Sequence, residues 1–240
     1  MKERLQKIIR NSGIASRREA EKWITSGRIS IDGVIVTELG TQADQETQVI
    51  CIDGVPLRKS ESHVYYLFYK PTSVVTTLHD PQGRPTIVDF IKEIPERIFP
   101  VGRLDQDTEG LLVLTNDGNL MNGLLHPSRE IPKIYQVKVK GIPDEKTLND
   151  LRNGVELTDG KTAPAKVKLL KSEKDTALLE IIIHEGKNRQ VRRMVGTVGF
   201  PAVALKRIGF AFLRLDGLTS GSFRPLSQEE VNRLREWCGI

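Results

Sequence analysis

The apolar positions near the start of the chain follow helical spacing and then change to strand-like runs. Leu5, Ile8 and Ile9 mark one face of a short helix. Residues 16–19, with the sequence Ser-Arg-Arg-Glu, have the spacing of a capping box and predict the start of a second helix. The runs 28–31 and 34–36 are joined by an Asp-Gly pair, which predicts a β-hairpin.

The rest of the chain shows mostly strand patterns. Runs of apolar and aromatic residues at 65–71, 133–140 and 178–183 predict strands, and the second of them alternates apolar and polar positions. Helical patterns return from Arg189 and after a capping box at residues 227–230. Because several predicted strands follow one another across short turns, we expect antiparallel pairing and an α+β fold.

A polar segment at residues 58–62 separates two patterned regions and is the predicted domain boundary. We expect a small N-terminal domain of residues 1–60 and a larger domain of residues 61–240. The larger domain is predicted to have a mainly antiparallel mixed sheet flanked by helices, with the site in a cleft across the sheet. Residues 76–90 are predicted to form a loop.

Residues 101–118 combine a polar loop with a buried strand. Arg103, Asp105, Asp107 and Glu109 place three carboxylates and one arginine within seven residues, and an apolar run follows. Loops that are supported by a rigid strand often carry site residues. Acidic residues in loops are also commonly solvated and without a specific role, so both interpretations stay open at this point.

Two other chemistries use closely spaced acids. A calcium loop is excluded, because the position that should supply a bidentate carboxylate is Asn116 and neither flank is helical. A pair of carboxylates for hydrolysis, as in glycosidases, rests only on the proximity of two acids and requires both of them to be essential.

The chain carries a net charge of +5, and the excess is concentrated at its start. Residues 1–36 contain eight basic and four acidic side chains. Arg17, Arg18 and Arg28 surround the second predicted helix, where they could hold phosphates. A solvated helical face is the alternative, and it is the usual meaning of such charges.

A second group of cations follows Gly186. Arg189, Arg192 and Arg193 project opposite the apolar stripe of the helix predicted from Arg189. Three arginines after a glycine-containing loop favour a contact with RNA or with a carboxylate. An ordinary amphipathic surface helix is the alternative interpretation.

The sequence contains no nucleotide-binding glycine motif, no metal-ligand spacing and no apolar run long enough to cross a membrane. Cys51 and Cys238 lie far apart, and the first residues lack the features of a signal peptide, which favours a cytoplasmic location. We therefore expect no cofactor, no metal and no membrane partner, and we expect a monomer.

The first quarter of the chain resembles the S4 RNA-binding module. The matching segments are residues 4–5, 13–20 and 27–33. Three further segments, in the same order along the chain, resemble the motifs of the RsuA/RluB/RluE/RluF family of rRNA pseudouridine synthases. They are residues 102–118 (without 106–107), 133–135 and 186–194.

The resemblance covers essentially the whole chain, and residues 161–165 and 184–190 look most like the RluB branch, whose substrate is large-subunit (23S) rRNA. The small-subunit (16S) branch, RsuA, is the near alternative. One position departs from the family pattern: the residue before Lys70-Pro71 is often Asn and here is Tyr69, which we expect to affect only local packing.

The resemblance also implies roles for individual residues. Asp105 is implied as the catalytic aspartate, which either bonds to C1′ of the ribose or removes a ribose proton to give a glycal. Tyr135 is implied to stack on the flipped base and to help remove the C5 proton. Arg192 is implied to pair with Asp105 and keep it ionised, and Arg103 to help hold the flipped-out nucleotide. The other basic residues expected at the RNA are Arg17, Arg18, Arg28, Lys133, Lys187, Arg189 and Arg193.

These roles agree with the chemistry. A nearby arginine favours the charged form of a carboxylate, and isomerisation requires no redox carrier, nucleotide or metal. The expected partner is ribosomal RNA. A non-catalytic S4-type ribosome-assembly factor is the alternative, and it accounts for the basic start of the chain but not for the motifs of the larger domain.

Overall fold

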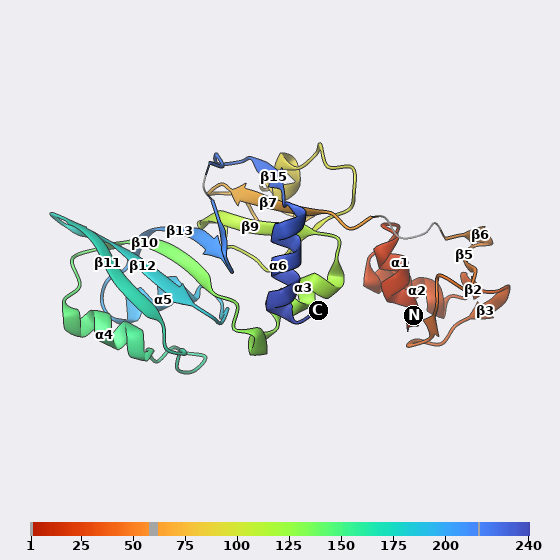
Figure 1. The fold of residues 1–240 in the computed structure, drawn as a ribbon, viewed down its shortest axis with the longest axis horizontal. Coiled ribbons are helices and arrows are strands. Elements are labelled where there is room, and N and C mark those ends of the chain that lie inside the picture. The colour runs from red at the N-terminus through yellow and green to blue at the C-terminus, as the bar shows by residue number, and fades with distance from the viewer. Residues whose placement is uncertain (1, 58–61, 216) are drawn as a thin grey trace. The chain divides into compact units, whose positions relative to one another are not determined.

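The computed structural model describes residues 2–57, 62–215 and 217–240, and the chain divides into two compact units (Figure 1). The first unit comprises Met1–Val64 with Pro95–Arg97 and Asn116–Gly118, and the rest of the chain forms the second. The predicted boundary between residues 60 and 61 lies outside the described residues.

The first unit contains two helices and a small sheet. The helices are α1 (Leu5–Asn11) and α2 (Arg17–Thr25). The sheet has the order β3-β2-β5-β6, formed by β2 (Ile29–Ile31), β3 (Val34–Val36), β5 (Ile50–Ile52) and β6 (Val55–Pro56), and a separate pair is formed by β1 (Glu3–Arg4) and β4 (Gln42–Ala43). The expected apolar face of α1 is buried, since Leu5, Ile8 and Ile9 are at most 3% exposed.

Local sequence signals account for this unit. Asp32 and Gly33 both have positive φ angles, of 51° and 84°, which is the turn that an Asp-Gly hairpin requires. The Ser16 hydroxyl caps α2 by accepting a hydrogen bond from the Glu19 amide (3.2 Å). The predicted return bond from the Glu19 side chain is replaced by a bond from the Trp23 indole nitrogen (3.1 Å). The hairpin is therefore confirmed, and the capping box is confirmed only in its serine half.

The second unit is built on one large sheet with the order β11-β12-β10-β13-β9-β7-β15. Its neighbouring strands are antiparallel except for β9 and β13, which are parallel. Two short strands pair at its side, β8 with β9 and β14 with β13. The strands are β7 (Tyr65–Lys70), β8 (Phe99–Pro100), β9 (Glu109–Thr115), β10 (Lys133–Lys140), β11 (Lys166–Glu173), β12 (Thr176–Ile183), β13 (Ala202–Phe210), β14 (Leu213–Arg214) and β15 (Phe223–Pro225). The predicted α+β fold with a mainly antiparallel mixed sheet is confirmed.

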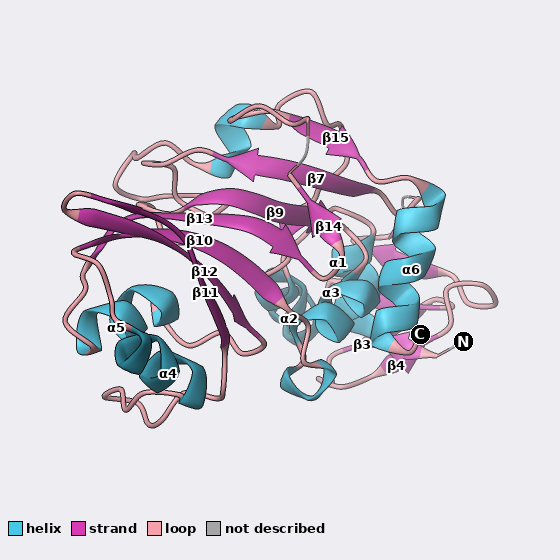
Figure 2. Ribbon diagram, turned by 60° about the vertical axis from the view of Figure 1, so that its left-hand side comes forward, coloured by secondary structure: helices cyan, strands magenta, loops and turns pink. Residues whose placement is uncertain are grey.

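Helices cover this sheet in two groups, each with its own apolar core (Figure 2). Side chains of α4 (Glu145–Asn153) and α5 (Gln190–Thr197) pack with β10 and β12. Side chains of α3 (Gly118–Leu125) and α6 (Gln228–Cys238) pack with β7 and β9. Two single-turn 3₁₀ helices, at Ile87–Phe90 and Pro127–Arg129, complete the unit. Over the described part of the chain, no helix combines the length and apolarity that a membrane crossing requires.

The structure differs from the sequence prediction at two places. The first 3₁₀ helix lies within residues 76–90, which were expected to be a loop throughout, and a capping box of Thr86 and Asp89 fixes it. Helix α3 follows closely after the strand of the 101–118 segment and was not predicted. It forms because Leu120 and Leu124 lie four residues apart and bury one helical face.

Candidate active site

Asp105 lies in the loop between β8 and β9, and hydrogen bonds hold the backbone of this loop on both sides of the carboxylate. Before it, the Thr76 hydroxyl donates to the Leu104 carbonyl (2.7 Å) and accepts from the Leu104 amide (3.2 Å). After it, the Ser73 amide donates to the Gln106 carbonyl (2.8 Å). These hydrogen bonds fix the backbone that carries Asp105, as a catalytic side chain requires.

A buried lysine supports the same loop. Lys70, the last residue of β7, is 0% exposed. Its ammonium donates to the carbonyls of Val74 (2.7 Å) and Pro71 (2.8 Å), and the Gln106 carbonyl lies 3.5 Å away. Burial lowers the pKa of Lys70 to about 8, against the opposing influence of the nearby carboxylates of the Asp105 loop.

Arginines at the start of α5 reach the Asp105 loop from the other side of the site. Arg189 Nη1 lies 3.8 Å from Asp105 Oδ2, and the Arg189 guanidinium donates to both carboxylate oxygens of Asp107 (2.9 and 2.8 Å). Arg192 donates to the Asp107 backbone carbonyl (2.7 Å), and its Nε lies 3.3 Å from Asp107 Oδ2. Hydrogen bonds from Arg189 and the charge of Arg192 hold the pKa of Asp107 below its usual value.

The predicted pairing of Arg192 with Asp105 is therefore wrong. Arg189 stands at the cap of α5 in a left-handed conformation (φ 47°), which directs its side chain to the Asp105 loop. Arg192 lies nearly one turn further into the helix, and its guanidinium is bound to Asp107 instead. Its catalytic role stays a prediction, and Arg189 is the arginine that faces Asp105.

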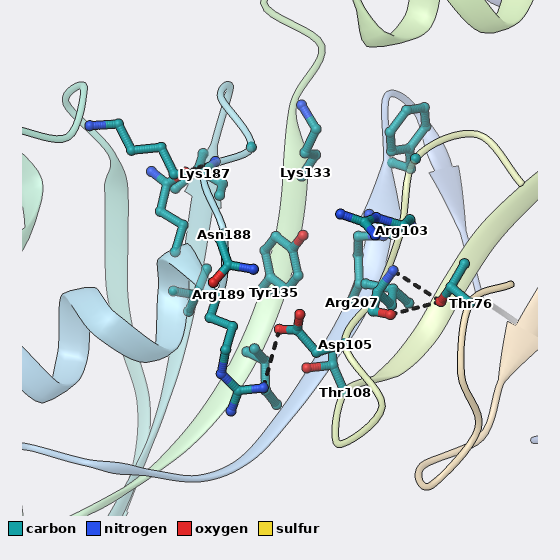
Figure 3. A pocket seen from close by; sticks show the side chains of 18 of the residues that line it. Thr76, Arg103, Asp105, Thr108, Lys133, Tyr135, Lys187, Asn188, Arg189 and Arg207 are labelled. Carbon is teal, nitrogen blue, oxygen red and sulfur yellow. Dashed lines mark hydrogen bonds and ion pairs between the residues drawn. The ribbon is translucent and has the colours of Figure 1, made fainter. Parts of the chain in front are cut away.

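Tyr135 brings an aromatic ring to the same place. It lies on β10, where the register with β13 shifts between Ile134 and Tyr135, and it is 8% exposed. In Figure 3 the Tyr135 ring lies beside the Asp105 carboxylate. Both residues line a pocket of about 460 Å³, which is within the range of small-molecule sites. A base that enters this pocket could stack on the Tyr135 ring, and the stacking role stays a prediction.

The pocket has a strongly positive lining. Its charged residues are one acid and five bases, namely Asp105, Arg103, Lys133, Lys187, Arg189 and Arg207. Arg103 is exposed and has no hydrogen bond or ion pair within the described residues, so its guanidinium is available to a ligand. This composition favours a polyanionic substrate.

Like Arg189, three further cations predicted to contact RNA form bonds within the protein. Lys133 donates to the carbonyls of Ile131 and His184 (both 3.0 Å), and burial, followed by the charge of Arg207, lowers its pKa to about 8. The Lys187 ammonium donates to the backbone carbonyls of residues 159, 160 and 161 (3.3, 2.7 and 2.9 Å). Arg193 forms a two-bond ion pair with Asp159 (2.8 and 3.0 Å). Lys187 and Arg193 thus fasten the loop after α4, and their contact with RNA stays a prediction.

The cations of the first unit differ from one another. Arg17 and Arg18 are exposed, and neither forms a hydrogen bond or ion pair in the described chain. Arg28 is also exposed, but it is bound to Asp53 through Nε (3.0 Å) and lies 4.9 Å from the centre of the Trp23 ring. Arg17 and Arg18 are therefore the better candidates for direct phosphate contacts.

Sequence reasoning missed three residues that shape the pocket. Thr76 and Lys70 act through the backbone of the Asp105 loop, and Arg207 is buried in β13 at the edge of the pocket. Lys70 stood out in the sequence only as part of the Lys70-Pro71 pattern at the end of a predicted strand. Arg207 carried no distinguishing signal in the sequence.

Together, an S4-like unit and a basic pocket with a carboxylate and a tyrosine define the class of RNA-modifying enzymes. Comparison with known proteins gives the same result. The model of the RNA pseudouridylate synthase family matches residues 64–196, and that of the S4 domain matches residues 3–49. The chain belongs to the RNA pseudouridine synthase family, whose members are isomerases, and the resemblance seen in its motifs is confirmed.

Individual relatives match over nearly the whole of this chain. The ribosomal large subunit pseudouridine synthase B of Bacillus subtilis (strain 168) is 49% identical over 97% of this chain and 96% of its own. The protein of the same name from Vibrio vulnificus (strain CMCP6) is 40% identical over 98% of this chain and 75% of its own. A crystal structure of a pseudouridylate synthase superposes with a TM-score of 0.70 at 32% identity, covering 96% of this chain and 99% of that one.

Proposed function

We propose that this enzyme converts one uridine of large-subunit (23S) ribosomal RNA to pseudouridine, with Asp105 as the catalytic carboxylate. The RNA target is supported by the names of two relatives that match 97% and 98% of the chain. The catalytic assignment is supported by one observation above all: Asp105, Tyr135 and Arg189, which are distant in sequence, meet at a single pocket.

The geometry suits the individual steps. The reaction breaks the bond from ribose C1′ to uracil N1, joins C1′ to C5, and moves a proton from C5 to N1. Asp105 is placed by a fixed backbone, and its carboxylate faces the Arg189 guanidinium at 3.8 Å. A carboxylate in this position can act as a nucleophile or as a base. Tyr135 is close enough to Asp105 for one nucleotide to touch both.

The free-energy cost of flipping the target base out of its stack has to be compensated by contacts in this pocket. Unstacking the target base costs a few kcal/mol, and stacking on an aromatic side chain such as Tyr135 returns about 1–3 kcal/mol. Arg103, which is exposed, supplies a cation for the phosphates of the flipped nucleotide. Arg17 and Arg18 supply a second contact with the RNA in the S4 unit. We also propose that the enzyme acts as a monomer, in the cytoplasm where ribosomal RNA is found.

The test is to delete the gene and map pseudouridines over the 23S and 16S rRNA of the deletion strain. We expect one 23S pseudouridine to disappear, to return with the wild-type gene, and not to return with Asp105→Asn. Asp175→Asn is the matched control, because Asp175 is an exposed acid in the β11–β12 turn, and it should restore the modification.

The outcomes separate the alternatives. A missing site in 16S rRNA would replace the proposed target by that of the small-subunit enzymes. No missing site would favour a binding factor without catalysis. Full complementation by Asp105→Asn would refute the catalytic assignment even if the target is right.

A further inference from the structure

A positively charged side chain is buried at the edge of the pocket, and no acid among the described residues forms an ion pair with it. Arg207, in β13, is 3% exposed, and its Nε donates to the Leu111 carbonyl (2.7 Å). Its guanidinium carbon lies 5.4 Å from the centre of the Phe210 ring. Nη2 is shielded from solvent and has no hydrogen-bond partner within the described chain. Arg207 and Phe210 both line the pocket that holds Asp105 and Tyr135.

The surroundings of Arg207 do not balance its charge. None of the ion pairs between described residues includes it, and its charge acts on another cation, Lys133, whose pKa it helps to lower. Burying an ion is costly unless it is paired, and a guanidinium cannot lose its charge by releasing a proton. A buried cation of this kind, with an unused donor at a pocket, is suited to a ligand that carries or develops negative charge.

The reaction itself creates such a charge. When the C1′–N1 bond breaks, its electron pair stays on the uracil and is shared by N1, O2 and O4. The charge disappears when C5 bonds to C1′, after which C5 gives up its proton and N1 gains one. The same uracil anion forms whether Asp105 bonds to C1′ or removes a ribose proton.

We propose that the Arg207 guanidinium donates a hydrogen bond to the uracil of the target nucleotide and stabilises the uracil anion formed in the reaction. This inference rests on the proposed function of the Asp105 pocket. The base is favoured over a phosphate because Arg207 is almost fully buried, whereas phosphates are bound at exposed positions such as that of Arg103. In Figure 3 Asp105 and Tyr135 lie between Arg207 on one side and Arg189 on the other, so a base beside Tyr135 has Arg207 within its surroundings.

The test compares Arg207→Met and Arg207→Lys with the wild type under single-turnover conditions at saturating RNA. Loss of one preorganised donor to a developing anion typically lowers the rate by about 10²–10³-fold. We expect a loss of that size in Arg207→Met, partial recovery in Arg207→Lys, and nearly unchanged RNA affinity for both. Lys206→Met is the matched control, because it removes the neighbouring cation of β13, whose ammonium lies over the Tyr69 ring (4.6 Å), and it should keep the wild-type rate.

A second substrate separates an electrostatic role from a structural one. Replacing the target uridine by 5-fluorouridine makes the leaving base a better anion, so cleavage of its N-glycosidic bond should depend less on Arg207. The rate loss in Arg207→Met should therefore be smaller with 5-fluorouridine than with uridine. An equal loss with both substrates, or an unchanged rate with uridine, would overturn the inference. Thermal unfolding of each variant shows whether the protein is folded. If Arg207→Met is not folded, the comparison is made with Arg207→Lys instead.

The inference and the proposed function fail in different ways. An inactive Asp105→Asn together with a fully active Arg207→Met would remove only the role of Arg207. If mapping identifies a different rRNA, the same variants are compared on that RNA. An active Asp105→Asn would remove the catalytic assignment, whatever the result for Arg207.

Discussion

Lys70 offers a sharp physical test, because the protein buries its ammonium completely next to the Asp105 loop. The perturbation is Lys70→Met, which keeps a long side chain and removes the charge. The hydrogen bonds to the carbonyls of Val74 and Pro71 disappear with it. The contact with the Gln106 carbonyl, next to the catalytic carboxylate, is lost as well.

The magnitude follows from the pKa of Lys70, which is lowered from 10.5 to about 8 in the folded protein. Between these values the unfolded chain binds a proton that the folded chain has released, so the free energy of unfolding rises with pH in this window. The full difference corresponds to about 3 kcal/mol. Stability is therefore reduced by the buried charge below pH 8, and the reduction is relieved as the pH approaches 10.5.

The assay is urea unfolding of both proteins at pH 7.5 and pH 10, in a Trp23→Phe background. This background leaves Trp237 of α6 as the only tryptophan, so its emission reports on the second unit. The wild type should gain about 2–3 kcal/mol relative to Lys70→Met between the two pH values. Lys168→Met, which alters an exposed lysine of β11, should show no such relative change. A stability difference between wild type and Lys70→Met that is the same at both pH values would refute the argument.

Three further predictions concern the strand contact, the ion-pair cluster and the S4 unit. Gly110→Ala should destabilise the protein by about 2–5 kcal/mol in urea unfolding, since Gly110 has a φ of 122° and a Cβ would lie 2.6 Å from the Arg207 backbone nitrogen. The control Gly196→Ala, in helix α5 with open space around it, should stabilise the protein by up to about 1 kcal/mol. Equal effects of the two substitutions would contradict this prediction. Asp107→Asn should change the free energy of unfolding by less than about 1 kcal/mol, because its ion pairs are half exposed. The same substitution should slow single-turnover catalysis, because it releases the arginines of α5. An unchanged rate would contradict this expectation. Alanine at Arg17 and Arg18 should lower the log–log salt slope of RNA binding by about one per lost contact, and an unchanged slope would show that neither touches a phosphate.

The sequence was sufficient where a local signal determines a local structure. The alternation in β10 places Tyr135 on the buried face, and the capping box of Ser227 and Glu230 starts α6 as expected. The motif around Asp105 also predicted a polar loop feeding a buried strand, which is the observed arrangement of residues 101–115. In the first two cases neighbouring residues along the chain supply the apolar face or the hydrogen bonds that define the element. The Asp105 loop is held in addition by Thr76, Ser73 and Lys70 from an earlier segment of the chain.

Pairing between distant side chains could not be obtained in the same way. Arg189 and Arg192 lie three residues apart on one helical face, so the sequence pattern gave no reason to prefer one of them as the partner of Asp105. The choice depends on the left-handed backbone at Arg189, which is a property of the folded loop before α5. Tertiary geometry therefore decides which arginine meets which acid.

The placement of the buried cations was even harder to predict from the sequence. Their positions also suggest a physical reason for the positive charge of the site. Lysine and arginine are usually exposed, so a sequence pattern assigns them to the surface by default. Here Lys70 and Lys133 have pKa values of about 8, and Arg207 adds a permanent charge beside Lys133. Their carbonyl partners satisfy hydrogen bonds but carry no negative charge, so the fold keeps several buried cations close to the Asp105 loop. Such an arrangement lowers the stability of the free protein, and its positive potential acts on whatever anion enters the pocket. A nucleotide that brings phosphates and then develops charge on its base is the kind of ligand that this potential stabilises most during reaction.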